Sequence, residues 1–163
     1  MKDTTTAYAK RVAASKIPAC KWVRLACARH LRDLKRGLFA WDAKEAERSI
    51  EFLRLMRHWK GEFAGQQFEP EPWQRFIVGS VFGWKREDGT RRYRCALVVV
   101  PRKNGKTFLG AGVCLRLLCA DGENGAEVYS LATKEEQARI VWNDGKEIIR
   151  ASKGFGEMLR RTV

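Results

Sequence analysis

The sequence of 163 residues contains no apolar run long enough to cross a bilayer. A membrane-spanning helix needs about 20 consecutive apolar residues, whereas the longest run here, Ala96–Pro101, has the length of a strand. The first 14 residues also lack the apolar core of a signal peptide. We therefore expect a soluble, intracellular protein with no membrane partner.

Paired cysteines are absent as well. The five cysteines are odd in number and include no C-x-x-C pair, so the sequence predicts neither a disulfide framework nor a zinc ribbon. Cys27 and His30 have the residue types of half a metal site, but no second pair matches them. We favour the alternative that both residues simply lie on one amphipathic helix.

Acidic residues are scarce relative to basic ones. The chain has 32 Lys and Arg against 19 Asp and Glu, a net charge of +13, and 45% of its residues are hydrophobic. That hydrophobic content suffices for a packed core and excludes disorder over most of the chain. Residues 1–69 carry +7 and residues 70–163 carry +6, so the excess is spread evenly. A chain this basic is expected to meet a polyanion, either nucleic acid or a charged membrane face.

Residues 1–69 predict a small helical subdomain. A first helix is opened by Pro18 and stopped by Gly37. Asp42 and Glu45 form the start signal of a second helix. Apolar residues recur at three- and four-residue spacing in both, as on the buried face of a helix. They are Val23, Cys27, Leu31 and Leu34 in the first helix and Ala46, Ile50, Leu53 and Met56 in the second.

Residues 70–163 predict an α/β domain. Pro72 suits the first turn of a helix, and Asp88-Gly89 is a hairpin turn signal. Strands and helices alternate after the hairpin: strand 93–100, helix 106–119, strand 127–132 and helix 134–151. This order, with short turns, is typical of a parallel sheet with flanking helices.

The segment that joins the first of these strands to its helix has the composition of a phosphate-binding loop. Residues 101–107 read Pro-Arg-Lys-Asn-Gly-Lys-Thr and fit G-x-x-x-x-G-K-[ST], except that Val100 stands at the first Gly. In such a loop, backbone N–H groups and the helix N-terminus face the phosphates. Lys106 reaches the β- and γ-phosphates and Thr107 binds Mg²⁺. The alternative is an ordinary strand-to-helix turn whose Lys and Thr are solvated.

The loop resembles that of the terminase large subunit of tailed double-stranded DNA bacteriophages, whose motif lacks the first Gly and carries an Arg. The resemblance implies a P-loop NTPase fold that uses Mg-ATP to package viral DNA. It further implies double-stranded DNA, a terminase small subunit, the capsid portal and further copies in a homo-oligomeric ring as partners, in the cytoplasm of the bacterial host. Other matching segments follow the same order: 26–34, 61–65, 73–77, 82–85, 120–123, 127–134 and 137–139.

The resemblance also implies roles for single residues. Arg102 would act in cis on the γ-phosphate, beside Lys106 as the other catalytic residue, and Gln74 would read adenine through its amide. Alternatively, Arg102 only positions phosphate or faces DNA, and Gln74 is a solvated residue of a helix start. Residues 132–137 would couple the ATP state to movement. The predicted nucleotide-binding residues are Gln74, Pro101, Arg102, Lys103, Asn104, Gly105, Lys106, Thr107 and Phe108.

A second, acidic core strand is missing from the sequence. Such an ATPase needs an acidic residue for Mg²⁺ and a Glu that polarises water. The one pattern match, residues 117–121, ends the predicted phosphate-loop helix, and we reject it. Only 56 residues follow Thr107, and nothing corresponds to a nuclease domain. We therefore expect an N-terminal portion of the family that binds ATP with little or no turnover and, because its sheet is incomplete, dissolves poorly alone.

Basic residues crowd around the predicted hairpin. They are expected to contact the DNA backbone or a neighbouring subunit, or alternatively to be solvated charges that aid solubility. Tryptophans 59, 73, 84 and 142 are expected to lie mostly in the core rather than to stack on bases. Two other functions stay open: another P-loop enzyme, such as a helicase-like ATPase or a small kinase, and a non-catalytic fragment that binds DNA or a partner. The hairpin residues are Lys85, Arg86, Arg91, Arg92 and Arg94.

Overall fold

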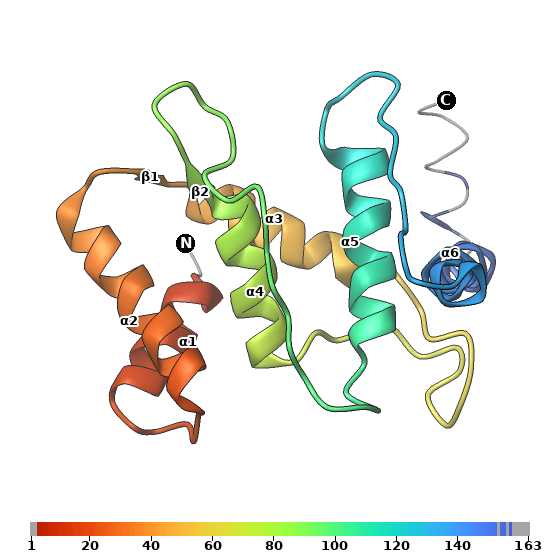
Figure 1. Ribbon diagram of the computed structural model, residues 1–163, viewed down its shortest axis with the longest axis horizontal. Coiled ribbons are helices and arrows are strands. Elements are labelled where there is room, and N and C mark those ends of the chain that lie inside the picture. The colour runs from red at the N-terminus through yellow and green to blue at the C-terminus, as the bar shows by residue number, and fades with distance from the viewer. Residues whose placement is uncertain (1–2, 153, 156, 158–163) are drawn as a thin grey trace. The chain divides into compact units, whose positions relative to one another are not determined.

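The computed structural model describes residues 3–152, 154–155 and 157 (Figure 1). By their internal contacts the residues form two compact units. Unit 1 comprises Met1–Ile50 and Pro70–Leu97, and unit 2 comprises Glu51–Glu69 and Val98–Val163. The predicted division of the chain at residue 69 stays a prediction.

Unit 1 is built from helices α1 (Thr4–Ala13), α2 (Lys21–Arg36) and α4 (Pro72–Gly83) and from the beginning of α3 (Ala43–Arg54). Helix α1 packs against both α2 and α4 (Figure 1). The strands β1 (Ala40–Trp41) and β2 (Trp84–Lys85) form a small antiparallel sheet that brings the ends of α2 and α4 together. The fold is therefore mixed, mostly helical with one two-stranded sheet.

The predicted helix signals in unit 1 are confirmed except for the start of α2, which begins at Lys21 with Cys20 as its N-cap rather than at Pro18. Gly37 caps α2 in the left-handed conformation, with φ of 65°, which costs glycine little. The Asp42 carboxylate accepts a hydrogen bond from the Glu45 N–H at 2.8 Å and starts α3. Pro72 occupies the first turn of α4. Lys85, the last residue of β2, forms an antiparallel β-bridge with Arg91, and Gly89 between them has φ of 79°. The predicted hairpin turn is thus also confirmed.

Helix α1 was not predicted from the sequence. Asp3 caps it by accepting from the Thr6 N–H at 2.8 Å. Tyr8, Ala9 and Val12, at helical spacing, are buried in one cluster with residues of α2 and α4. The cap and the spacing are the two signals that indicate this helix.

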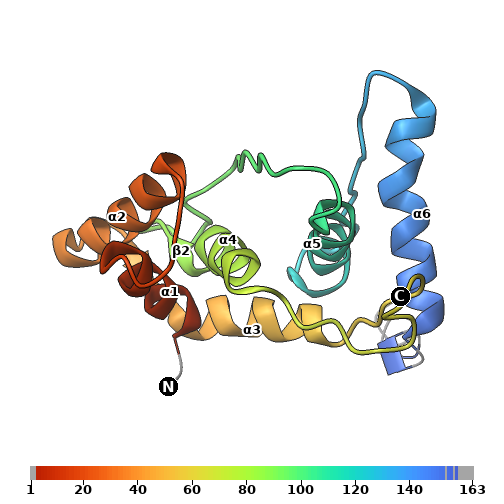
Figure 2. The same ribbon diagram turned by 90° about the horizontal axis from the view of Figure 1, so that it is seen from below.

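Unit 2 contains α5 (Lys106–Ala120) and α6 (Glu135–Ala151), which confirm the two predicted helices. They pack on each other with steeply crossed axes, as the two views show (Figures 1 and 2). A Cβ atom added at Gly112 of α5 would lie 2.8 Å from Leu53 Cδ2, so the absence of a side chain allows this close approach.

The predicted parallel sheet is not found in the described part of the chain. Neither residues 93–100 nor residues 127–132 are paired as strands. Residues 97–100 and 126–131 do show the period-two exposure of a strand with one covered face: in the first, Leu97 and Val99 are exposed while Val98 is half-buried. The two strand predictions are therefore wrong for the described residues, because a strand requires a hydrogen-bonded neighbour and not only an apolar pattern.

No helix among the described residues has the length and apolar character that crossing a membrane requires.

Candidate phosphate-binding site

The phosphate loop of unit 2 turns through two left-handed residues just before α5. Lys103 has φ of 65° and Gly105, the N-cap of α5, has φ of 69°. Left-handed residues that alternate with right-handed ones turn successive N–H groups to one side and form a concavity for anions. Lys103 is not a glycine, so its conformation is strained, a feature that occurs often at functional sites.

The first turn of α5 has no side-chain cap. Its N–H groups carry the positive end of the helix dipole, where a phosphate is stabilised. Residues 101–106 are exposed, and Thr107 is half-buried. The backbone geometry therefore fits the anionic group that the sequence predicted there.

Lys106 folds back over the loop. Its Nζ donates to the carbonyl oxygens of Val100 and Pro101, both at 3.2 Å. The Asn104 amide donates to the carbonyls of Pro101 and Arg102, at 3.3 and 3.1 Å. The Lys106 bonds hold its ammonium against the carbonyls at the start of the loop, and the Asn104 bonds connect the loop backbone to itself.

Phe108 fixes the start of α5 rather than facing the loop. Its ring stacks on His58 with centroids 4.9 Å apart and contacts Phe68 at 4.6 Å. Burial lowers the pKa of His58, which favours the neutral ring in this aromatic stack. Sequence reasoning missed His58 and Phe68, because no spacing pattern connects them with the loop.

The rejected acidic match at residues 117–121 lies on the helix. Helix α5 runs to Ala120, and Asp121 is its C-cap residue. The Asp121 carboxylate accepts from Arg116 at 3.0 Å. Its rejection as a metal-binding strand is thus confirmed. Within the described residues no three His, Cys, Asp or Glu side chains cluster as a metal site would require.

Gln74 of unit 1 is buried at the first turn of α4 and is not solvated. Its Oε1 accepts from the Glu71 N–H at 2.8 Å and completes a capping box. Reading adenine uses both the oxygen and the nitrogen of an amide, and here the oxygen already has a donor. The adenine-binding role of Gln74 stays a prediction.

The hairpin cations of unit 1 differ in their surroundings. Arg94 is exposed, whereas Lys85, Arg86, Arg91 and Arg92 are half-buried. The Arg92 guanidinium pairs with Asp33 at 2.8 Å and lies 3.9 Å from the centre of the Phe39 ring. Arg92 therefore joins the hairpin to α2, and the predicted DNA contacts stay untested.

Cys27 and His30 are both buried on the inner face of α2. His30 Nδ1 accepts from Trp84 Nε1 at 3.0 Å, and His30 Nε2 lies 2.9 Å from Thr6 Oγ1. Both ring nitrogens are thus occupied by protein partners. Burial lowers the pKa of His30 to about 4, which keeps the ring neutral.

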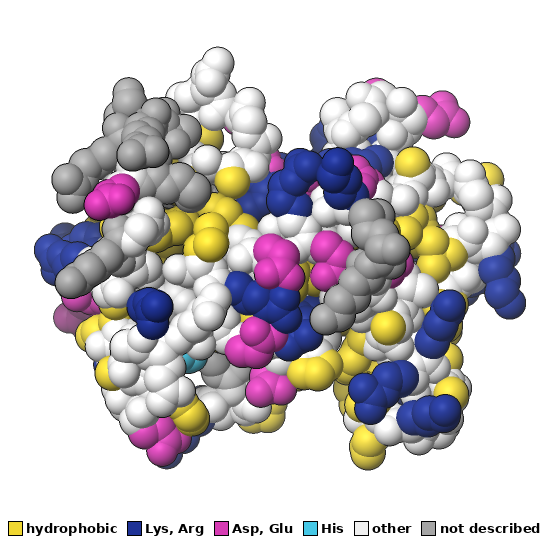
Figure 3. Space-filling view, turned by 180° about the vertical axis from the view of Figure 1, so that it is seen from behind, with side chains coloured by type: hydrophobic (Ala, Val, Ile, Leu, Met, Phe, Trp, Pro, Cys, Tyr) yellow, Lys and Arg dark blue, Asp and Glu magenta, His cyan; other side chains and the backbone are white. Residues whose placement is uncertain are grey.

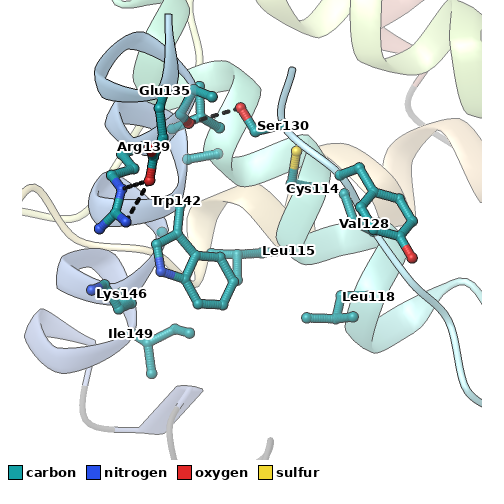
Figure 4. A pocket seen from close by; sticks show the side chains of 15 residues that line it. Cys114, Leu115, Leu118, Val128, Ser130, Glu135, Arg139, Trp142, Lys146 and Ile149 are labelled. Atoms are coloured by element: carbon teal, nitrogen blue, oxygen red, sulfur yellow. Dashed lines mark hydrogen bonds and ion pairs between the residues drawn. The ribbon is translucent and has the colours of Figure 1, made fainter. Parts of the chain in front are cut away.

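An apolar cavity of about 520 Å³ lies between α5, residues 128–130 and α6. Figure 4 shows Trp142 of α6 facing Leu115 and Leu118 of α5. Trp142 is 61% exposed, whereas Trp84 is buried and Trp59 and Trp73 are half-buried. No residue of the phosphate loop lines this cavity, so it is not part of the predicted nucleotide site.

Comparison with known proteins decides the family. The model of the family described as "Terminase large subunit, ATPase domain" matches residues 72–162, more than half of the chain. The chain belongs to the terminase large subunit family. A curated relative, the "Terminase, large subunit" of Enterobacteria phage HK97, is 29% identical over 118 residues. The family predicted from the phosphate loop and the flanking segments is thus confirmed.

The alignment covers 71% of this chain but 22% of the HK97 terminase, so the chain spans about a fifth of that relative's length. The match to the terminase ATPase domain begins at Pro72, the first residue of α4, and includes the whole phosphate loop. No solved structure is significantly similar to the chain.

Proposed function

We propose that residues 101–107 bind Mg-ATP and that the nucleotide powers the movement of viral double-stranded DNA into a procapsid. The geometry of the loop carries this proposal. Two left-handed residues precede an uncapped helix, and the Lys106 ammonium bonds to carbonyls of the same loop. Together they form the concave, positively charged backbone that phosphates require.

The residues present fit a nucleotide and its metal. Lys106 would leave the loop carbonyls and donate to the β- and γ-phosphates, and the Thr107 hydroxyl would bind Mg²⁺ that the phosphates also hold. Arg102, exposed at the tip of the loop, would stabilise charge on the γ-phosphate in the transition state. Bound Mg²⁺ would neutralise charge that develops on the phosphate oxygens.

We further propose a P-loop NTPase fold for residues 70–163. The extended segments on either side of α5 support it, because each has one half-buried face and one exposed face. Further strands of a terminase would pair with these segments and form a parallel sheet. Double-stranded DNA, the small subunit, the portal and a ring of copies in the host cytoplasm are the proposed partners and setting.

Calorimetric titration with Mg-ATP tests the nucleotide site. We expect the full chain to bind, and Lys106→Ala to weaken binding by tenfold or more, on the order of a charge-assisted hydrogen bond lost. Lys146→Ala removes the same charge from an exposed position of α6 and should bind like the parent chain. Equal affinity of Lys106→Ala and the parent chain would refute the site.

Hydrolysis is a separate measurement. We expect little or no turnover by the purified chain, because its sequence offers no acidic residue at the end of a second core strand. Sustained phosphate release that disappears in Lys106→Ala would show that this expectation is wrong while leaving the proposed binding site intact.

A further inference from the structure

The excess positive charge belongs almost entirely to unit 1. Unit 1 has 18 Lys and Arg against 8 Asp and Glu, a net charge of +10, whereas unit 2 has 14 against 11, a net charge of +3. The charge is spread evenly along the sequence but unevenly between the units. Residues 51–69, which belong to unit 2, have no net charge, whereas residues 70–97 belong to unit 1. A polyanion would therefore be attracted chiefly to unit 1.

Within unit 1, the exposed side of α2 is basic along its whole length. At 3.6 residues per turn, its six basic residues fall within an arc of about 140°. Its single acidic residue, Asp33, is buried on another side of the helix. A helix of 16 residues is about 24 Å long. The residues of this basic face, all exposed, are Lys21, Arg24, Arg29, Arg32, Lys35 and Arg36.

Most charges of the basic face are not neutralised. In the part of the chain that the structure describes, the basic face has one ion pair, which joins Arg32 to Asp33 at 3.6 Å. Arg29 lies over the ring of Tyr93 at 5.4 Å. Four like-charged pairs at spacing three or four repel each other: Lys21 with Arg24, Arg29 with Arg32, Arg32 with Lys35, and Arg32 with Arg36.

Helix α3 shows the opposite arrangement. Arg48 pairs with Glu45 at 2.8 Å, and Arg54 pairs with Glu51 and Glu69. The space-filling view shows acidic and basic side chains intermixed over this helix (Figure 3). Both arginines of α3 are thus ion-paired, whereas one of the six cations of the basic face of α2 is, so the basic face is not a general result of composition.

The basic face is also held rigidly. Arg92 of the hairpin pairs with Asp33 at 2.8 Å, and His30 bonds to Thr6 and Trp84. These contacts fix the inner side of α2 in the core of unit 1. The cations on its outer side are therefore presented at fixed spacing rather than on a mobile arm.

We propose that the basic face of α2 binds the phosphate backbone of duplex DNA without reading its sequence. A duplex carries one charge per ~1.7 Å of axis with both strands counted, so a stretch as long as this helix, about 24 Å, carries on the order of a dozen phosphates on its two strands. The core of a protein interface is depleted of charged residues in general, although Arg is enriched there. A face with six cations and one ion pair is instead complementary to a polyanion. The choice of DNA rests on the proposed packaging function, but the binding surface does not involve the nucleotide site.

Fluorescence anisotropy of a labelled 30-base-pair duplex, titrated with the full chain at several salt concentrations, tests the proposal. The triple variant Arg24→Gln, Arg32→Gln, Arg36→Gln should weaken binding about tenfold or more and lower the salt slope by two to three, since each lost phosphate contact removes about one. The control triple Arg139→Gln, Lys146→Gln, Arg150→Gln removes the same charge from exposed positions of unit 2.

The proposal is supported if only the α2 triple changes the slope, on duplexes of different sequence alike. It is overturned if both triples weaken binding equally, if neither does, or if the α2 triple loses affinity for polyglutamate as strongly as for the duplex. Mg-ATP titration of the α2 triple separates the two proposals, because loss of the DNA surface should leave nucleotide affinity unchanged. Circular dichroism shows that the variant is folded.

Discussion

The two units of this chain differ in their charge and in how many of their large apolar side chains are exposed. Unit 1 buries His30, Thr6 and Asp33 with partners and keeps its large excess of charge outside. Both units leave large apolar side chains at the surface, but unit 2 leaves more of them: of the twelve among the described residues, four belong to unit 1 and eight to unit 2, with Leu97 91% exposed in unit 1 and Val99 82% and Leu131 91% exposed in unit 2. Unit 2 therefore shows more of the uncovered face at which a further layer would pack.

The largest difference between the units should appear when a tryptophan is removed from each. Trp84 of unit 1 is 1% exposed and donates to His30, whereas Trp142 of unit 2 is 61% exposed. We expect Trp84→Ala to cost about 3–5 kcal/mol of unfolding free energy, because it opens a cavity and leaves a ring nitrogen unpaired. Trp142→Ala should cost less than about 1 kcal/mol. Guanidinium unfolding followed by far-ultraviolet circular dichroism measures both.

Similar costs for the two variants would contradict this comparison. If the two units unfold in separate transitions, only the transition of unit 1 should shift in Trp84→Ala. Tryptophan-to-alanine changes remove the same atoms from both units, so the pair controls for composition.

Acid should destabilise unit 1 through His30. The pKa of this ring is lowered to about 4 in the folded state, mainly by burial. The unfolded state, with a pKa near 6.5, then binds a proton that the folded state does not. Stability is therefore fully present above pH ~6.5 and falls between pH ~6.5 and ~4, by about 3 kcal/mol from this group.

Urea midpoints measured from pH 7 to pH 4 test this dependence. In His30→Gln the side chain does not titrate, so the fall between pH 6.5 and pH 4 should be smaller, although the variant starts from a lower stability at pH 7. An equally steep fall in both chains would assign the acid sensitivity to other groups.

We also expect the ion pair of unit 1 to contribute more to the unfolding free energy than the ion pair of unit 2. Arg92 and Asp33 of unit 1 form a largely shielded pair, with side chains 16% and 10% exposed. Arg54 of unit 2 pairs with Glu69, whose side chain is 57% exposed. We expect Arg92→Met to cost about 2 kcal/mol, because it leaves a buried carboxylate poorly paired, and Arg54→Met at most about 1 kcal/mol.

Double-mutant cycles with Asp33→Asn and Glu69→Gln measure the two coupling energies. A coupling energy for Arg54 and Glu69 as large as that for Arg92 and Asp33 would show that exposure does not distinguish the pairs. Duplex binding by Arg92→Met also addresses the hairpin, because an arginine bound to Asp33 should contribute little to phosphate contacts.

The helices and the loop were predictable because their signals are local. Gly37 and Pro72 mark helix ends by backbone conformation alone, and Gly105 is followed directly by the lysine and threonine of the phosphate motif. Each signal depends on a few adjacent residues. The same holds for the hairpin, whose Asp88-Gly89 turn determines its own geometry.

Contacts that span long stretches of chain were not predictable. His30 meets Thr6 across 24 residues and Trp84 across 54, so no periodicity connects these three side chains. Strand 93–100 was predicted from its apolar residues, but pairing depends on a neighbour that a single segment does not specify. The excess of positive charge in unit 1 was also not predictable. Unit 1 consists of two stretches that are separated in the sequence, so comparing residues 1–69 with residues 70–163 does not reveal it.

The smallest effect on stability is expected at the exposed apolar residues of unit 2. Leu131→Lys should change the unfolding free energy by less than about 0.5 kcal/mol, because its side chain is 91% exposed. The same change should raise the concentration at which the chain self-associates, since an added charge discourages pairing of an exposed strand edge. Light scattering across a concentration series measures self-association, and urea unfolding measures stability.

Thr133→Lys is the matched control, because it adds the same charge two residues away at a position that is exposed but not apolar. If net charge alone governs solubility, both variants should improve it equally, and the comparison between the units loses its basis. If the uncovered strand face governs it, only Leu131→Lys should. In that case the exposed apolar side chains of residues 126–131 form a surface at which another strand or chain would pack, not an ordinary solvated surface.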